Sequence, residues 1–138
     1  MLKKFLSIFP WNIDLASLLL RVFMGGFMAY SHGWGKLMKW EELKMDFAEP
    51  FGMSMSTAAG LTIFAELFCA LFIIAGLLTR FACIPIIICM AVAAFNAHAG
   101  DPLDDREGSL TYMASFLAMF FLGAGKYSLD FLLFRKRS

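Results

Sequence analysis

Four long apolar segments alternate with shorter polar stretches along the chain. These segments comprise residues 15–31, 56–78, 81–98 and 109–123. A helix needs about 20 mostly apolar residues to cross the hydrocarbon core of a bilayer, and each segment comes near that length. Pro85 falls near the start of the third segment, where a helix tolerates proline. The pattern therefore predicts an all-α integral membrane protein, in which residues 1–138 form a single domain built as a four-helix bundle.

Shorter amphipathic stretches predict helices that lie in the membrane interface. Between the first two segments, apolar residues recur at helical spacing while acidic residues occupy the opposite arc. The apolar ones are Leu37, Trp40, Leu43 and Phe47, and the acidic ones are Glu41, Glu42, Asp46 and Glu49. Residues 1–10 and 131–137 combine apolar and basic side chains at the two ends of the chain. We expect both to be interfacial segments, the first of them uncleaved.

Basic residues collect on one side of the predicted membrane, and this asymmetry predicts the orientation. One side carries Lys3, Lys4, Arg80, Lys126, Arg135, Lys136 and Arg137. The other side carries Lys36, Lys39, Lys44 and Arg106, together with eight acidic residues. Loops rich in Lys and Arg stay in the cytoplasm. Both termini are therefore expected to be cytoplasmic, with the acidic side facing outward.

Composition narrows the classes of function. Hydrophobic residues make up 60% of the chain and the formal net charge is +1, so we expect membrane lipid, and no nucleic acid, as a partner. Cys69, Cys83 and Cys89 lie in apolar stretches and form no Cys-x-x-Cys pair, which disfavours a disulfide-exchange mechanism. The sequence has no phosphate-loop, dinucleotide or serine-hydrolase motif. It thus identifies no catalytic residue.

Two charged residues, Arg21 and Glu66, fall inside the apolar segments. A charge at the bilayer centre costs about 2.5–3.5 kcal/mol on insertion scales, so each needs a partner or a function. At a rise of about 1.5 Å per residue the two lie at similar depths, which predicts that they pair. Two interpretations stay open: an ion pair that only fixes the register of two helices, or a proton or ligand site at that pair.

Polar residues at the outer ends of the segments form a second group of candidates. We expect His32, His98 and Glu107 to meet in an extracytoplasmic pocket, where histidine can exchange protons near neutral pH. The predicted ligand or proton site comprises Arg21, His32, Glu66, His98 and Glu107, with Trp34, Lys36, Asp101 and Tyr112 as secondary candidates. Their spacing matches no compact ligand motif, so no metal is predicted. The alternative is that these residues are interfacial and merely solvated.

Several short motifs together resemble the DoxX family of four-helix bacterial membrane proteins. In chain order they are Leu18-Leu-Leu-Arg21, His32-Gly-Trp-Gly-Lys36, Glu66 among small residues, Gly76-Leu-Leu-Thr-Arg80, His98, Glu107 and Gly123-Ala-Gly-Lys-Tyr-Ser-Leu-Asp130. The last is similar to the family's G-P-G-[KR]-[YF]-S-L-D signature, with Ala124 where proline is usual. The resemblance runs from about Asp14 to Asp130 and implies a location in the bacterial inner membrane.

The resemblance also implies a link to redox chemistry. The family's name derives from association with subunits of an archaeal thiosulfate:quinone oxidoreductase, and some bacterial members are linked to membrane oxidoreductase complexes. Our first hypothesis is a subunit that binds a quinone or another small lipophilic molecule between its helices, with partner subunits supplying the redox centre. The second is a non-catalytic scaffold, chaperone or transport protein that recognises a lipid, a solute or a partner helix. A Phe-rich exterior would also allow a homo-oligomer.

Overall fold

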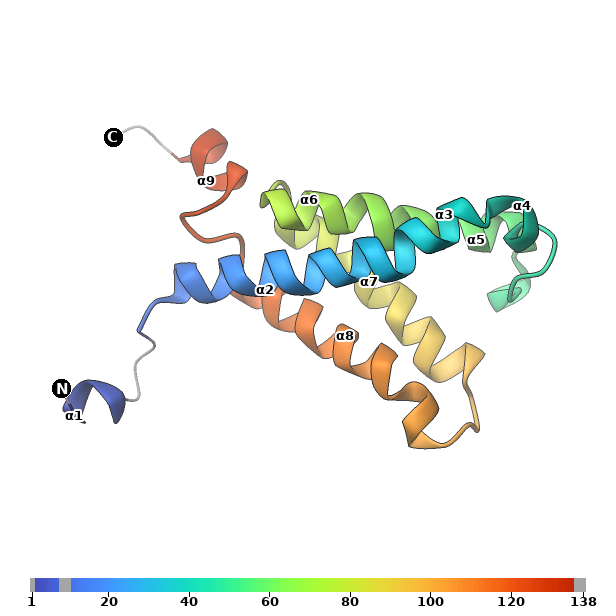
Figure 1. Cartoon of the computed structure of the whole chain (residues 1–138), viewed down its shortest axis with the longest axis horizontal. Coiled ribbons are helices and arrows are strands. Elements are labelled where there is room, and N and C mark those ends of the chain that lie inside the picture. The colour runs from blue at the N-terminus through green and yellow to red at the C-terminus, as the bar shows by residue number, and fades with distance from the viewer. Residues whose placement is uncertain (1, 8–10, 136–138) are drawn as a thin grey trace.

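Four long helices form a bundle in the structure, a computed structural model that describes residues 2–7 and 11–135 (Figure 1). Three of them change from α-helix to π-helix along their length without a break. The first consists of α2 (Ile13–Phe27), η1 (Met28–Trp34) and α3 (Gly35–Met38). The second consists of α5 (Met55–Ile63), η3 (Phe64–Cys69) and α6 (Ala70–Ala75). The third consists of α7 (Thr79–Val92) and η4 (Ala93–Ala97), and the fourth is α8 (Leu103–Leu122).

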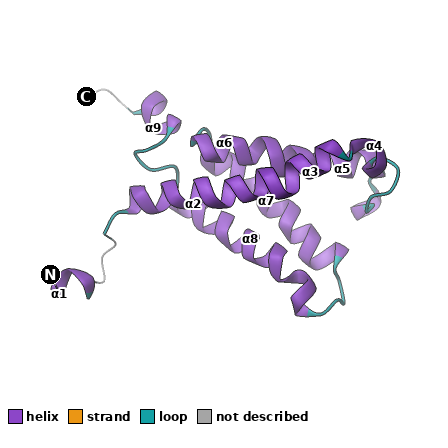
Figure 2. Ribbon diagram, viewed as in Figure 1, coloured by secondary structure: helices purple, strands orange, loops and turns teal. Residues whose placement is uncertain are grey.

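Short helices flank this bundle. They are α1 (Leu2–Phe5), α4 (Trp40–Leu43), the 3-10 turn η2 (Pro50–Gly52) and α9 (Leu129–Phe134). We call the end of the bundle that carries residues 39–54 and 98–102 the α4 end, and the end that carries residues 76–78 and 123–134 the α9 end. The residues that the structure describes form helices, turns and loops and no strand (Figure 2), which confirms the all-α class.

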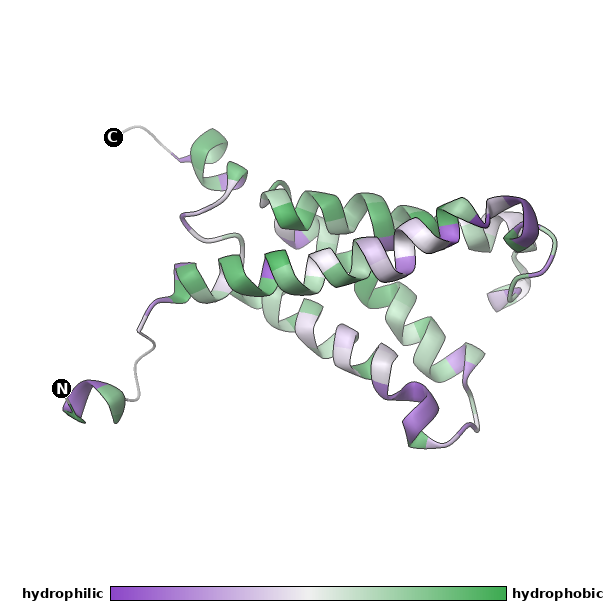
Figure 3. Ribbon diagram, in the orientation of Figure 1, coloured by the Kyte–Doolittle hydropathy of each residue, from purple (hydrophilic) through white to green (hydrophobic). Residues whose placement is uncertain are grey.

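The lengths and composition of the long helices fit a membrane. Three of them, Ile13–Met38, Met55–Ala75 and Thr79–Ala97, are long and apolar enough to cross one. The fourth, α8, has 20 residues but begins with a charged stretch, residues 104–107, before turning apolar. Figure 3 shows the hydrophilic positions concentrated near the ends of the helices. These features confirm the predicted all-α membrane protein.

The first long helix continues beyond the predicted limit of residue 31 and ends at Met38. The polar residues after position 30 lower the hydropathy, but they include no proline, so the helix has no reason to stop. The predicted surface helix is correspondingly short: α4 has four residues, and Trp40 at its start packs against the core. At the termini, α1 has exposed side chains, while residues 1, 8–10 and 136–138 lie outside the described parts of the chain.

Hydrogen bonds to backbone atoms tie the long helices together at the α9 end. Ser17 Oγ donates to the carbonyl oxygen of Gly123 at 2.7 Å, which joins the first helix to the end of α8. The Asp130 carboxylate accepts from the backbone N–H groups of Leu78 at 2.7 Å and Thr79 at 3.0 Å. These N–H groups belong to the start of α7 and have no partner within that helix. The segment after α8 therefore holds the other helices together at this end.

Candidate ligand-binding site

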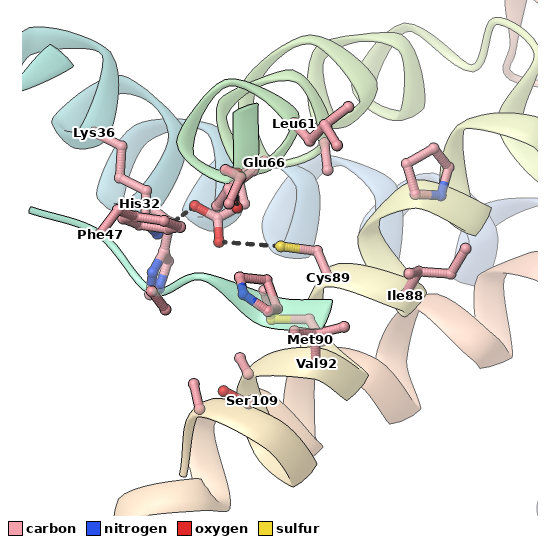
Figure 4. A pocket seen from close by; sticks show the side chains of 18 of the residues that line it. His32, Lys36, Phe47, Leu61, Glu66, Ile88, Cys89, Met90, Val92 and Ser109 are labelled. Carbon is pink, nitrogen blue, oxygen red and sulfur yellow. Dashed lines mark hydrogen bonds and ion pairs between the residues drawn. The ribbon is translucent and has the colours of Figure 1, made fainter. Parts of the chain in front are cut away.

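The bundle opens toward the α4 end and encloses a cavity there of about 750 Å³. Figure 1 shows the start of α8 and the end of the third helix diverging from the first and second helices. All four long helices contribute to the walls, together with residues from the segment between α4 and α5. Figure 4 shows Lys36, His32 and Glu66 on one side of the cavity and Ile88 on another. Most of the wall is apolar, so the few polar groups would determine which ligand binds and in which orientation.

An ion pair between Lys36 and Glu66 lies in the wall of this cavity. Lys36 Nζ is 2.5 Å from Glu66 Oε2, and the two side chains are 27% and 3% exposed. The Cys89 thiol donates to the other carboxylate oxygen, Glu66 Oε1, at 3.8 Å (Figure 4). A buried carboxylate is strongly unfavourable without a counter-charge. Lys36 therefore makes the burial of Glu66 tolerable, and the pair places a charged donor against an apolar space.

The predicted pairing of Arg21 with Glu66 is wrong. Arg21 is fully buried, but its Nη1 donates to the carbonyl oxygen of Ile74 at 3.1 Å and its Nη2 donates to that of Tyr127 at 2.5 Å. Ile74 lies in the last turn of α6, where the carbonyl groups have no partner within the helix. Arg21 therefore caps α6 at the α9 end, and it does not line the cavity.

The backbones of the first two long helices touch beside the ion pair. A Cβ atom built on Gly33 in η1 would lie 2.6 Å from the backbone nitrogen of Leu67 and 2.7 Å from the carbonyl oxygen of Glu66. Only glycine permits so close an approach. Lys36 follows three residues later on the same helix, within reach of the carboxylate. The contact joins η1 to η3, and such π-helical turns occur frequently at functional sites.

His32 and Tyr112 line the cavity from the first and fourth helices. Their ring centroids are 5.2 Å apart in an edge-to-face arrangement. Tyr112 also stacks on Phe116, which is fully buried, with ring centroids 6.4 Å apart. Because His32 precedes Lys36 by four residues, both side chains lie on one face of the first helix. The ring contact thus bridges the first and fourth helices where they begin to diverge.

His98 lies at the mouth of the cavity at the α4 end. Its Nδ1 is 2.9 Å from Asp101 Oδ2, and the two side chains are 43% and 47% exposed. Solvent weakens such an exposed interaction, so it contributes little to stability. Glu107 is exposed and does not line the cavity, and Trp34 is 50% exposed. The structure therefore brings the two histidines to one cavity and leaves Glu107 outside it.

Sequence reasoning did not select four polar residues of the cavity wall, Thr62, Cys89, Asp105 and Ser109. Thr62 lies four residues before Glu66 and therefore on the same helical face, so this spacing could have indicated that Thr62 belongs to the site. The contact of Cys89 with Glu66 joins two different helices, and no spacing along the chain indicates it. Among the described residues, no group of three or more His, Cys, Asp and Glu side chains is arranged to hold a metal ion. The wall does offer hydrogen-bond donors, chiefly the Lys36 ammonium and the Tyr112 hydroxyl.

Together, these features define an all-α membrane protein whose helix bundle encloses a largely apolar cavity with a partly buried ion pair in its wall. The family model for DoxX matches residues 16–99, and the chain belongs to the DoxX family. This match ends before α8, so the similarity of residues 123–130 to the family's terminal signature remains a resemblance of sequence. No curated protein and no solved structure matches the chain.

Proposed function

We propose that the cavity binds a small lipophilic molecule with a polar head group, of the quinone class, and that the protein is a subunit of a membrane oxidoreductase system. The observation that carries this proposal is the Lys36–Glu66 ion pair in the wall of a largely apolar cavity of about 750 Å³. Small-molecule sites typically measure about 300–1,000 Å³ and combine apolar walls with a few polar groups. A quinone matches such a site, because it has oxygen acceptors on its ring and hydrocarbon elsewhere.

Each polar side chain has a role in this proposal. Lys36 donates to a ring oxygen of the head group, and Glu66 holds the ammonium in place. The Tyr112 hydroxyl offers a second donor. His32, between them, exchanges a proton with the head group when the head group changes its redox state. Arg21 and Glu107 take no part, because neither lines the cavity.

A partner subunit supplies the electrons in this proposal. The three cysteines of the chain are free thiols, so they form no disulfide that could accept electrons. Apolar side chains on the outside of the long helices face lipid and leave a surface on which such a subunit can pack. We place the protein in a bacterial inner membrane with the α9 end, which carries Lys126 and Arg135, toward the cytoplasm.

The test is mass spectrometry of organic extracts from gently purified protein. The wild type is compared with the double variant Lys36→Met/Glu66→Gln, which removes the cavity ion pair without leaving a lone buried charge. The matched control is Lys44→Met/Glu41→Gln, which removes the exposed ion pair between Lys44 and Glu41. Circular dichroism and gel filtration verify that all three proteins are folded.

We expect a quinone in extracts of the wild type and the control, and its loss from the cavity variant. This result would support the proposed site, because quinone binding would depend on the ion pair in the cavity and not on the exposed ion pair. If the cavity variant retained as much quinone as the wild type, the quinone would bind at another site. Absence of any specific small molecule from the wild type would refute the proposal and favour the scaffold or transport hypothesis.

A further inference from the structure

We infer that the ligand carries a hydrocarbon tail that leaves the cavity sideways, between the second and third long helices, at the middle of the membrane. This inference rests on the proposed function and specifies the ligand as an amphiphile taken directly from the bilayer. Its basis is a group of side chains that line the cavity and are also exposed on the outside of the bundle. They are Leu61, Phe64 and Ile88, and we call the space between them the lateral opening.

Exposure of these side chains shows that the cavity wall is incomplete at this point. Leu61 is 53% exposed, Phe64 is 48% exposed and Ile88 is 58% exposed, although all three line the cavity. A side chain lining a closed cavity would be buried by the packing around it. Figure 4 shows Leu61 on the second helix and Ile88 on the third, with the cavity between them. All the side chains at the lateral opening are apolar, so they suit hydrocarbon rather than water.

The depth of the lateral opening identifies what can pass through it. Ile88 lies nine residues after Thr79, the first residue of α7 at the α9 end. Phe64 lies eleven residues before Ala75, the last residue of α6 at the same end. At about 1.5 Å per residue these positions are roughly 14–17 Å from that end, and the hydrocarbon core is about 30 Å thick. The lateral opening therefore faces the middle of the bilayer, where acyl chains are present and polar head groups are absent.

Other routes out of the cavity suit a tail poorly. The gap between the first and fourth helices is bridged by the ring contact of His32 with Tyr112. The mouth at the α4 end carries the polar residues His98 and Asp105 among apolar ones and opens at the end of the bundle, so a tail leaving there would enter water. Glu66 lies nine residues before Ala75, at the level of the lateral opening. A head group held at the ion pair can thus extend its tail directly into lipid.

The lateral opening is tested by photolabelling from the bilayer. The protein is placed in phosphatidylcholine nanodiscs that contain a phospholipid with a photoreactive diazirine in the middle of one acyl chain. The variant Ile88→Trp narrows the lateral opening. The control is Ile84→Trp, one turn earlier on α7, because Ile84 is 41% exposed and does not line the cavity.

We expect irradiation to label the cavity residues Thr62 and Met90 in the wild type and in Ile84→Trp. Ile88→Trp should reduce that labelling several-fold and leave the labelling of the outward-facing Phe95 unchanged. Unlabelled Thr62 and Met90 in the wild type, or equal labelling in Ile88→Trp, would overturn the inference. Because no quinone is involved, this result is independent of whether the proposed function is correct.

The tail itself is tested with two probes that share one benzoquinone head group, one with a decyl tail and one without a tail. Binding to the purified protein is measured by calorimetry. We expect the wild type and Ile84→Trp to bind the decyl probe more tightly by at least about tenfold, equivalent to about 1.4 kcal/mol. Ile88→Trp should lose that preference but keep its affinity for the tail-less probe. Equal affinity of the wild type for both probes would refute the inference that the ligand carries a hydrocarbon tail. If neither probe bound, the proposed head group would be refuted, and the photolabelling alone would test the lateral opening.

Discussion

Replacing Lys36 by methionine should strongly destabilise the protein, because the Glu66 carboxylate would stay buried without a counter-charge. The Glu66 side chain is 3% exposed, and removing one partner of a buried ion pair costs about 3–5 kcal/mol. We therefore expect Lys36→Met to lower the free energy of unfolding by about 3–5 kcal/mol at pH 7.

The opposite single variant should be milder. Glu66→Gln leaves the Lys36 side chain, which is already 27% exposed and flexible enough to turn its ammonium toward water. We expect it to lower the free energy of unfolding by about 1–2 kcal/mol. The double variant Lys36→Met/Glu66→Gln leaves no charge in the wall, so its loss should be well below the sum of the two single losses.

The assay is equilibrium unfolding in mixed micelles of increasing dodecyl sulfate content, followed by circular dichroism. The four proteins of the cycle give the coupling free energy between Lys36 and Glu66. The same cycle on the exposed pair of Lys44 and Glu41 serves as the control, because exposed ion pairs couple by less than about 1 kcal/mol. A coupling between Lys36 and Glu66 no larger than that of the control would refute the claim that Glu66 depends on Lys36.

Three further predictions concern other parts of the molecule. Gly33→Ala should lower the unfolding temperature much more than Gly35→Ala, because a Cβ at Gly33 would meet backbone 2.6 Å away while Gly35 has nothing within 4 Å; equal shifts would contradict the close approach of the two helices. Arg21→Met should lower the free energy of unfolding by about 1.5–3 kcal/mol, since several carbonyl groups lose a charged donor. Hydrogen exchange should then rise at the end of α6, and unchanged exchange there would argue against capping by Arg21. A reporter that fluoresces only when folded in the cytoplasm should fluoresce when fused to the C-terminus, and a dark fusion would reverse the proposed orientation.

Hydropathy located the four long helices of this protein, although the first ends later than predicted and the fourth begins at Leu103 rather than at residue 109. A bilayer demands a run of apolar residues for every crossing, and that demand acts on each segment separately. The predicted segments 56–78 and 81–98 correspond to Met55–Ala75 and Thr79–Ala97 in the structure. The first helix was predicted too short because hydropathy falls at His32 and Lys36, although a buried polar site does not interrupt the backbone hydrogen bonds of a helix.

The sequence also identified most of the polar residues in the cavity wall. His32, Lys36, Glu66, His98 and Tyr112 were all candidates, because a polar group inside an apolar segment stands out against its surroundings. Their partners were not evident from the sequence. Arg21 has the charge to pair with Glu66, but it lies level with Ile74, about 12 Å along the second helix from Glu66, and caps α6 instead.

The physical reason is that a sequence gives positions along each helix alone, whereas pairing depends on how neighbouring helices are offset along their axes and turned around them. The rise per residue is nearly constant, so distances along one helix follow from the sequence. The offset between two helices depends on where they touch: Gly33 contacts the backbone at Glu66, and this leaves Arg21 level with Ile74 near the end of α6. The sequence by itself thus determined the class of protein and the positions of its helices. Only the tertiary structure decided that Lys36 neutralises Glu66 and that the helices diverge to form a cavity beside that pair.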